Sequence, residues 1–373
     1  MILLLNDFQR LLALGVSMSE TRAHVKSLFS LTKPRVVVLL QITAMCAILS
    51  HDLIKKNELG FETLEIMIIV FIGGYLTAGG ANCINMWYDR DIDPIMTRTS
   101  KRPLSTGEIS PQKALFFGIF ISIIGTLWLL EMANEVAAFW ALFSILFYVF
   151  IYTIWLKRIS VQNIVIGGIA GSTPPVIGWA AAEGNLELSI TSIENFIDSI
   201  VNIGGYMPWF MFLLIFLWTP PHFWALALYR SDEYQKVGVP MMPNIKGKER
   251  TLIEMKIYTI FLILLSLTTP LVYKEVDNWL ETPDLNASLI IINSLILTIW
   301  YSMTVWGIKI NEGNDEQNRM PTASHSFFIS LTYLAIMFII LVLSSSNYFI
   351  NGSVISTLLI IYIILSGRNL TDV

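Results

Sequence analysis

Long apolar runs are the feature that most constrains the fold of this 373-residue chain. A membrane-crossing helix needs about 20 predominantly apolar residues, and such runs recur along the whole sequence. Segments of alternating hydrophobicity, the pattern of membrane β-strands, are not found between them. We therefore predict an all-α fold, a polytopic transmembrane helix bundle of nine spans with a tenth candidate at 354–365. The nine spans lie at about 34–50, 63–86, 112–131, 135–156, 161–182, 207–229, 252–273, 286–308 and 326–346.

The composition excludes several classes of protein. Charged residues make up 14% of the chain and hydrophobic residues 54%, with a mean hydropathy of +0.63. Ordinary soluble domains hold about 25% charged residues, so neither a soluble globular protein nor a disordered chain is expected. The net charge of −4 leaves no basic surface for a nucleic-acid partner. Cys46 and Cys83 lie in apolar runs and form no CxxC pair, so the sequence predicts neither a disulfide scaffold nor a structural zinc site.

The loops predict the orientation of the chain, because cytoplasmic loops of membrane proteins are rich in Lys and Arg. If the N-terminus is cytoplasmic, the only lysines and arginines on the outer side of the membrane are Lys55, Lys56 and Lys274. Arg368, beyond the tenth candidate, is left unassigned. The N-terminal segment lacks the features of a transit peptide, which favours a prokaryotic plasma membrane over the mitochondrial inner membrane. We divide the chain into an N-terminal cytoplasmic segment (1–30), a transmembrane domain (31–346) and a tail (347–373).

A first polar cluster ends the second span. Asn85, Asp89 and Asp93 are spaced by four residues, which puts one amide and two carboxylates on one helix face. Such carboxylates repel each other unless a cation lies between them, and oxygen ligands of this kind suit Mg²⁺ together with a substrate phosphate. An alternative is a solvated helix end with ordinary surface charges, but the depth of Asn85 in an apolar run favours a functional site. Three cations that suit phosphate oxygens follow in the same loop: Arg98, Lys101 and Arg102.

A second polar cluster ends the sixth span. Pro220 and Pro221 are expected to break the helix in mid-span, and His222 follows them directly. The alternative for His222 is a hydrogen-bonded core histidine, but the predicted break favours a site residue. About three turns further on come two carboxylates, Asp232 and Glu233, of which either is a candidate ligand for a second metal ion.

These motifs resemble the UbiA superfamily of intramembrane prenyltransferases. Asn85-xxx-Asp89-xxx-Asp93, followed by Arg98-Thr99 and Arg102-Pro103-Leu104, is similar to the first signature of that superfamily. The resemblance is closer to the branch that farnesylates heme B. It rests on four further segments: Leu31 to Arg35, Tyr152 to Trp179, Trp218 to Ala227, and Gly238 to Pro243.

The resemblance implies nine helices around a cavity open to the bilayer, and transfer of farnesyl from farnesyl diphosphate to a vinyl group of heme B. Water adds in the same overall reaction, giving heme O and diphosphate, with Mg²⁺ as cofactor and heme B as substrate. Heme A synthase or a terminal oxidase assembly would then be partners. We expect six residues to bind substrate, with Arg35 or Arg158 pairing with heme propionates and His222 ligating heme iron or positioning the ring: His222, Arg35, Arg158, Asn163, Tyr229 and Lys236.

The sequence departs from the superfamily pattern in the later loop, where a second DxxxD motif is often found and where Asp232, Glu233 and Lys236 stand here. We favour Glu233, because it precedes Tyr234 where this branch usually has Asp-Tyr. Two other readings stay open: prenyl transfer to another aromatic or tetrapyrrole acceptor, and a transporter. Against the transporter, the polar residues gather at one face rather than at the midplane.

Overall fold

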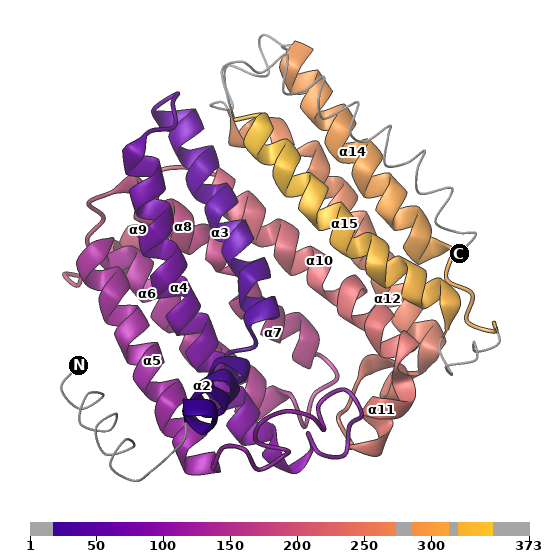
Figure 1. The fold of residues 1–373 in the computed structure, drawn as a ribbon. Coiled ribbons are helices and arrows are strands. Elements are labelled where there is room, and N and C mark those ends of the chain that lie inside the picture. The colour runs from indigo at the N-terminus through magenta and orange to yellow at the C-terminus, as the bar shows by residue number, and fades with distance from the viewer. Residues whose placement is uncertain (1–17, 274–284, 313–319, 346–373) are drawn as a thin grey trace.

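The computed structural model describes residues 18–273, 285–312 and 320–345, with side chains left aside for 18–21, 231–233 and 285–287. The predicted tenth span lies outside these residues. In the described part the regular elements are all helical, which confirms the predicted fold class (Figure 1). They are α2 (Met18–Leu31), α3 (Pro34–Lys55), α4 (Phe61–Tyr88), η1 (Asp89–Asp91), α5 (Pro111–Met132), α6 (Glu135–Leu146), η2 (Phe147–Leu156), α7 (Asn163–Ser172), α8 (Pro174–Glu183), α9 (Ile193–Val201), α10 (Met207–Tyr229), α11 (Ser231–Lys236), α12 (Met242–Leu267), η3 (Thr269–Val272), α14 (Leu285–Trp306) and α15 (Pro321–Leu343).

Eight helical segments of the described chain are long and apolar enough to cross a membrane, so the protein is an integral membrane protein. They match eight of the nine predicted spans. The remaining one, 252–273, forms α12 and η3, and α12 packs between α10 and α14. It falls outside the set because α12 contains several charged residues, among them Arg250, Glu254 and Lys256.

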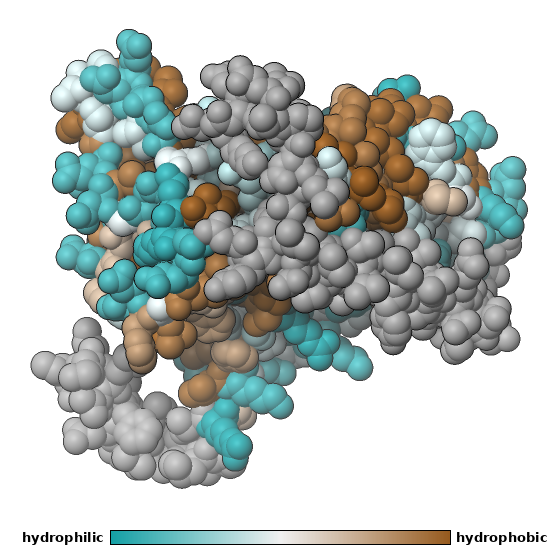
Figure 2. Space-filling view, turned by 90° about the horizontal axis from the view of Figure 1, so that it is seen from above, coloured by the Kyte–Doolittle hydropathy of each residue, from teal (hydrophilic) through white to brown (hydrophobic). Residues whose placement is uncertain are grey.

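The surface matches a lipid environment. Large apolar side chains are exposed along several spans, for example Phe116 at 71%, Phe150 at 56% and Met303 at 68%. Figure 2, viewed from above, shows broad hydrophobic areas on one flank and hydrophilic residues gathered on another. Bilayer tails, rather than water, are the solvent that such a surface fits.

The helices pack closely where glycines face a neighbouring backbone. A Cβ on Gly80 of α4 would lie 2.6 Å from the carbonyl oxygen of Gly118 on α5, and one on Gly178 of α8 would lie 2.4 Å from that of Ala44 on α3. Small residues of this kind let membrane helices approach without a hydrophobic driving force. These contacts hold α3, α4, α5 and α8 as one side of the bundle.

The long α10 joins this side to the other, because it packs against α7, α8, α12 and α15 (Figure 1). Pro220 and Pro221 do not break it, so the predicted mid-span break is wrong: the helix runs from Met207 to Tyr229 through both prolines. Both prolines are buried, and the hydroxyl of Thr219 donates to the carbonyl oxygen of Ile215 at 2.7 Å. Tight packing on several sides preserves a membrane helix that lacks two backbone donors.

Candidate functional site

The first polar cluster sits where α4 ends. Asn85 lies in the last turn of α4, and Asp89 opens the short helix η1. The backbone N–H of Asp93 donates to the carbonyl oxygen of Asp89 at 2.9 Å, so a helical turn continues past the end of α4. All three side chains are buried, with Asp89 only 1% exposed and Asp93 3%. The predicted spacing therefore brings one amide and two carboxylates into the protein interior.

Each of these three side chains is paired with a cation from a different part of the chain. The Lys33 Nζ donates to Asn85 Oδ1 at 2.7 Å, and Lys157 forms a short ion pair with Asp89. The Arg102 Nη1 donates to Asp93 Oδ2 at 2.5 Å. Since a buried charge is costly unless it is paired, these contacts are what allow the carboxylates to lie inside.

Two of those cations were not found by sequence reasoning. Lys33 lies between α2 and α3 with φ 52° and ψ 60°, a left-handed conformation that costs a residue with a Cβ about 1–3 kcal/mol. Burial, and then the neighbouring charges of Arg102 and Lys157, lower the pKa of Lys33 to about 7. A strained, half-buried lysine aimed at Asn85 is the kind of arrangement that functional sites hold. Two sequence signals point to Lys33: it directly precedes a span that opens with proline, and it lies in the segment Leu31 to Arg35, on which the family resemblance partly rests.

Lys157 follows a π-helical segment, η2, at the end of the fourth span. π-Helical turns are rare and are frequent at functional sites. η2 also places the Thr153 hydroxyl, whose oxygen accepts a hydrogen bond from Asn85 Nδ2 at 3.1 Å, and the rings of Tyr148 and Tyr152 stack within it at 5.3 Å. A Cβ on Gly167 of α7 would lie 2.3 Å from Tyr152, so the glycine makes room for that ring.

Arg158 is held beside the cluster rather than inside it. Its guanidinium donates two hydrogen bonds to Asp91, at 2.6 and 2.7 Å, and lies 4.6 Å from the centre of the Tyr88 ring. Its Nη2 is 3.9 Å from Asp89 Oδ1. The bidentate bond to Asp91 orients Arg158, so it contributes positive charge at the edge of the site.

The second polar loop meets the first one. Asn163, at the start of α7, donates to the carbonyl oxygens of Ser160 at 2.5 Å and Pro240 at 3.4 Å. Ile92 from the first loop packs against the cluster that contains Val239 and Met241 from the second. Both loops gather at one end of the bundle, beside α2, α7 and α11 (Figure 1). We refer to this end as the loop end.

The remaining predicted residues are placed as follows. Asp232 and Glu233 belong to α11, but their side chains lie outside the described part, so their role as metal ligands stays a prediction. Tyr229 is buried at the end of α10. Four further cations are exposed: Arg35, Arg98, Lys101 and Lys236. Within the described part of the chain none of those four makes a hydrogen bond or an ion pair, so Lys33 rather than Arg35 is the cation of that segment inside the cluster.

His222 lies away from the aspartates, between α10 and α15. Its Nδ1 is 2.6 Å from the hydroxyl oxygen of Ser330, and its ring is stacked between Trp218 at 4.1 Å and Phe327 at 4.7 Å. It is 6% exposed. This is the geometry of a hydrogen-bonded core histidine, the alternative weighed from the sequence, and it leaves Nε2 as the nitrogen available to a ligand.

The donor set fits a divalent cation. Asp89 Oδ1 is buried and has no hydrogen-bond partner, and the side-chain oxygens of Asn85 and Asp93 belong to the same helical turns. Mg²⁺ takes one or two carboxylates and fills its other positions with water and phosphate. Within the described residues no three His, Cys, Asp or Glu side chains converge on one point.

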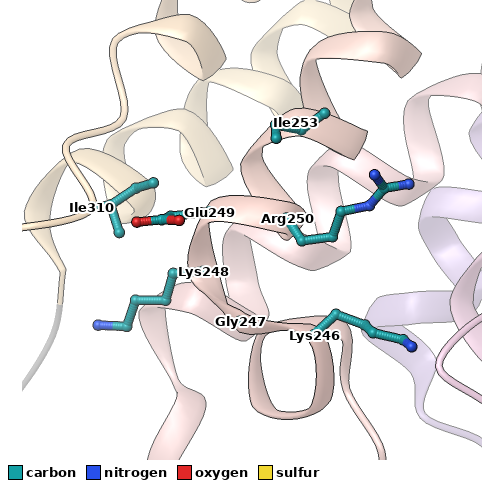
Figure 3. Close-up of a pocket in the computed structure, with 7 residues that line it drawn as sticks. All are labelled: Lys246, Gly247, Lys248, Glu249, Arg250, Ile253 and Ile310. Carbon is teal, nitrogen blue, oxygen red and sulfur yellow. The ribbon is translucent and has the colours of Figure 1, made fainter.

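A separate surface pocket of about 420 Å³ lies at the start of α12, near Gly247. Figure 3 shows that its charged side chains diverge: Lys248 and Glu249 extend toward Ile310, whereas Lys246 and Arg250 extend the other way. Arg250 is also paired with Glu254 at 2.5 Å. Because its cations do not converge, this pocket is a weaker candidate for binding an anion than the cluster at α4.

Comparison with known sequences agrees with these features. A sequence model of the UbiA prenyltransferase family matches residues 57–331. The chain is 38% identical to the protoheme IX farnesyltransferase of Bartonella tribocorum over 334 residues, which cover 88% of this chain and 94% of that protein. It is 45% identical to the protoheme IX farnesyltransferase of Trichodesmium erythraeum over 248 residues, which cover 66% of this chain and 68% of that protein.

Comparison with solved structures shows a shared fold. A structure reported for the biosynthesis of digeranylgeranylglyceryl phosphate synthase in membranes has a TM-score of 0.61 at 19% identity, and the match covers 87% of this chain and 99% of that one. A UbiA homologue from Archaeoglobus fulgidus bound to DMAPP and Mg²⁺ has a TM-score of 0.51 at 18% identity, covering 85% of this chain and 99% of that one.

Proposed function

The chain belongs to the UbiA prenyltransferase family, and we propose that it transfers the farnesyl group of farnesyl diphosphate to a vinyl group of heme B. Water adds in the same overall reaction, so the products are heme O and diphosphate. The observation that carries the donor side is the buried Asp89 carboxylate, whose Oδ1 accepts no hydrogen bond and lies among cations from three segments. The acceptor is supported by the names of the curated relatives, which the chain matches over most of its length.

Asn85, Asp89 and Asp93 would hold Mg²⁺, and Asp232 or Glu233 would hold a second ion. The metal, when bound, supplies positive charge that stabilises the diphosphate as it leaves. The chain's own cations add to that stabilisation: Arg102 and Lys157 from beside the aspartates, Lys33 from beside Asn85. Arg98 and Lys101 are exposed in the same loop and are free to turn toward the diphosphate. Fixed charges aimed at developing charge in a water-poor site are an effective form of catalysis.

Loss of diphosphate leaves an allylic cation on the farnesyl chain, which the electron-rich heme vinyl group attacks. Water then captures the cation formed on the vinyl side and loses a proton. The stacked Tyr148 and Tyr152 belong to the same π-helical segment as Thr153, which accepts a hydrogen bond from Asn85, and their ring faces suit stabilisation of a cation close to the diphosphate. The apolar interior of the bundle suits the farnesyl tail and most of the porphyrin.

Heme binding is assigned to residues around this interior. Arg35 and Arg158 suit the propionates, although Arg158 would have to share its guanidinium with Asp91. His222 suits the iron or the ring edge through Nε2, since Nδ1 faces Ser330. Asn163, Tyr229 and Lys236 complete the proposed substrate-binding set where the two loops meet.

The membrane orientation follows from the distribution of Lys and Arg. The loop end would face the cytoplasm, and the host membrane would be a prokaryotic plasma membrane. Heme A synthase or a terminal oxidase assembly would receive the product.

The test is to incubate purified protein in detergent with heme B, farnesyl diphosphate and Mg²⁺, and to follow the pigment by mass spectrometry. Formation of the hydroxyethylfarnesyl heme, lost on chelation of the metal, is expected. Release of diphosphate with unchanged heme would support the assignment of the donor site but would show that heme B is not the acceptor. If correctly folded protein changed neither substrate, prenyl transfer itself would be refuted.

A further inference from the structure

The short helix α9 has a face that the rest of the described chain does not cover. Ile193, Ile197 and Val201 follow one another at a spacing of four residues along it, and they are 81%, 52% and 47% exposed. Residues at that spacing lie on one side of a helix. Ile190, just before the helix, is 88% exposed. On a helix surrounded by water, apolar side chains are normally buried, and the exposed positions are polar.

The other two sides of α9 are different in kind. Phe196 and Ile200 turn toward the protein: the ring of Phe196 meets that of Phe139 edge to face at 5.5 Å, and Trp140 donates to the carbonyl oxygen of Ile200 at 3.0 Å. Glu194, Asn195 and Asp198 are exposed and polar. The helix is thus divided lengthwise into a protein side, an apolar side and a charged side.

The contacts of α9 also fix its depth. Phe139 and Trp140 belong to the span Glu135–Leu156 and come about one helical turn after its start, roughly 6–8 Å along the helix axis. Trp209, near the start of the span Met207–Tyr229, donates to the carbonyl oxygen of Val201 at 3.0 Å. Figure 1 shows α9 beside α6 and α8, away from the loops of the loop end. α9 therefore lies level with the first turns of two membrane spans, at the end opposite the loop end.

We propose that α9 lies in the plane of the membrane surface, with Ile193, Ile197 and Val201 inserted among the lipids of the leaflet opposite the loop end. Lipid is the occupant expected at this depth, because α9 contacts the first turns of two membrane spans. Trp140, Trp209 and the exposed Tyr206 stand at the same level, where aromatic residues border the headgroups. The charged side then faces water, as in interfacial amphipathic helices.

The test is a depth measurement on single spin labels. Cys46 and Cys83 are replaced by Ala, and nitroxide labels are placed at Ile197→Cys and, as the matched control on the polar side of the same helix, at Asn195→Cys. The labelled protein is reconstituted into phosphatidylcholine vesicles. Collision rates with oxygen, which concentrates in lipid, and with a water-soluble nickel chelate are then compared. We expect the oxygen-to-nickel ratio to be severalfold higher at position 197 than at 195, and Val201→Cys to repeat the result.

Equal ratios at the two positions would show that water surrounds α9 and would overturn the proposal. Poor access of both reagents to position 197 would also overturn it, because a protein surface would then cover the face. Dipolar coupling between labels would identify that surface as a second copy of this chain, and its absence would point to another partner. The outcome does not depend on the prenyltransferase activity.

Discussion

Replacing Asp89 by Asn should have two separable effects, on stability and on turnover. Asp89 is 1% exposed and pairs with Lys157, whose side chain is 18% exposed. Removing one partner of a buried ion pair costs about 3–5 kcal/mol, and since Lys157 keeps some access to solvent we expect about 3 kcal/mol. The Asp89 oxygen Oδ1, which accepts no hydrogen bond, also lies at the proposed metal site. Loss of a group that stabilises developing charge lowers kcat by about 10²–10³-fold.

The double variant Asp89→Asn/Lys157→Met tells these effects apart. Methionine removes the positive charge of Lys157, which Asp89→Asn leaves without a partner, and keeps much of the side-chain volume. The unfolding temperature in detergent should therefore return toward that of the unmodified protein. Turnover should stay low, because neither the carboxylate nor the cation is restored. Asp91→Asn is the matched control: Asp91 sits in the same turn and pairs with Arg158, but its side chain is 56% exposed.

Turnover is measured as diphosphate release, and metal affinity as Mn²⁺ binding by electron paramagnetic resonance. If Asp89→Asn bound Mn²⁺ and released diphosphate as well as the Asp91→Asn control does, the assignment of Asp89 as metal ligand would be refuted. Recovery of turnover in the double variant would show instead that Asp89 acts only as the counter-ion of Lys157.

Three further outcomes follow from the structure. Chelation with EDTA should stop diphosphate release, and added Mg²⁺ should restore it; persistent release would contradict a metal at Asn85, Asp89 and Asp93. Ser330→Ala leaves His222 Nδ1 without its partner, so unfolding should become easier by about 1–3 kcal/mol while diphosphate release stays near its original rate, as measured by thermal denaturation beside the assay. Gly178→Val places a side chain against the carbonyl oxygen of Ala44, and we expect it to lower stability by at least about 1–3 kcal/mol; a well-folded variant would show that α3 and α8 can separate freely.

The spans could be predicted because the bilayer imposes a single simple demand, about 20 apolar residues, on each of them. The prediction failed where local rules met tertiary packing. Proline removes a backbone donor wherever it stands, yet α10 stays helical through Pro220 and Pro221, because the neighbouring helices surround it. Local propensity says nothing of that support.

The site was predicted only in part, because spacing in the sequence reveals local neighbours but not contacts made by tertiary packing. Asn85, Asp89 and Asp93 stand close in sequence, so their shared helix face can be derived from spacing alone. Lys33 and Lys157 reach them from 52 and 68 residues away in sequence, a proximity that only the packing of α3, α4 and η2 creates. A similar network at the opposite end, where His51 bridges Asp52 and Glu183 at 2.8 and 2.9 Å, was also invisible to spacing, because Glu183 comes from α8.

The charge balance of the site connects its stability with its proposed chemistry. Arg102, Lys157 and Arg158 pair with the carboxylates of Asp93, Asp89 and Asp91, so the charges of these three pairs cancel. Lys33, whose pKa is about 7, adds a positive charge when it is protonated. Such a balance lets buried aspartates fold into the bundle, since each charge has a partner. A diphosphate brings more negative charge than one divalent cation cancels, and protonated Lys33 is the cation of the cluster that would accept the remainder. A site with aspartates alone would bind the metal but repel the leaving group, so the lysines that the spacing could not reveal are as necessary to the proposed reaction as the aspartates that it could.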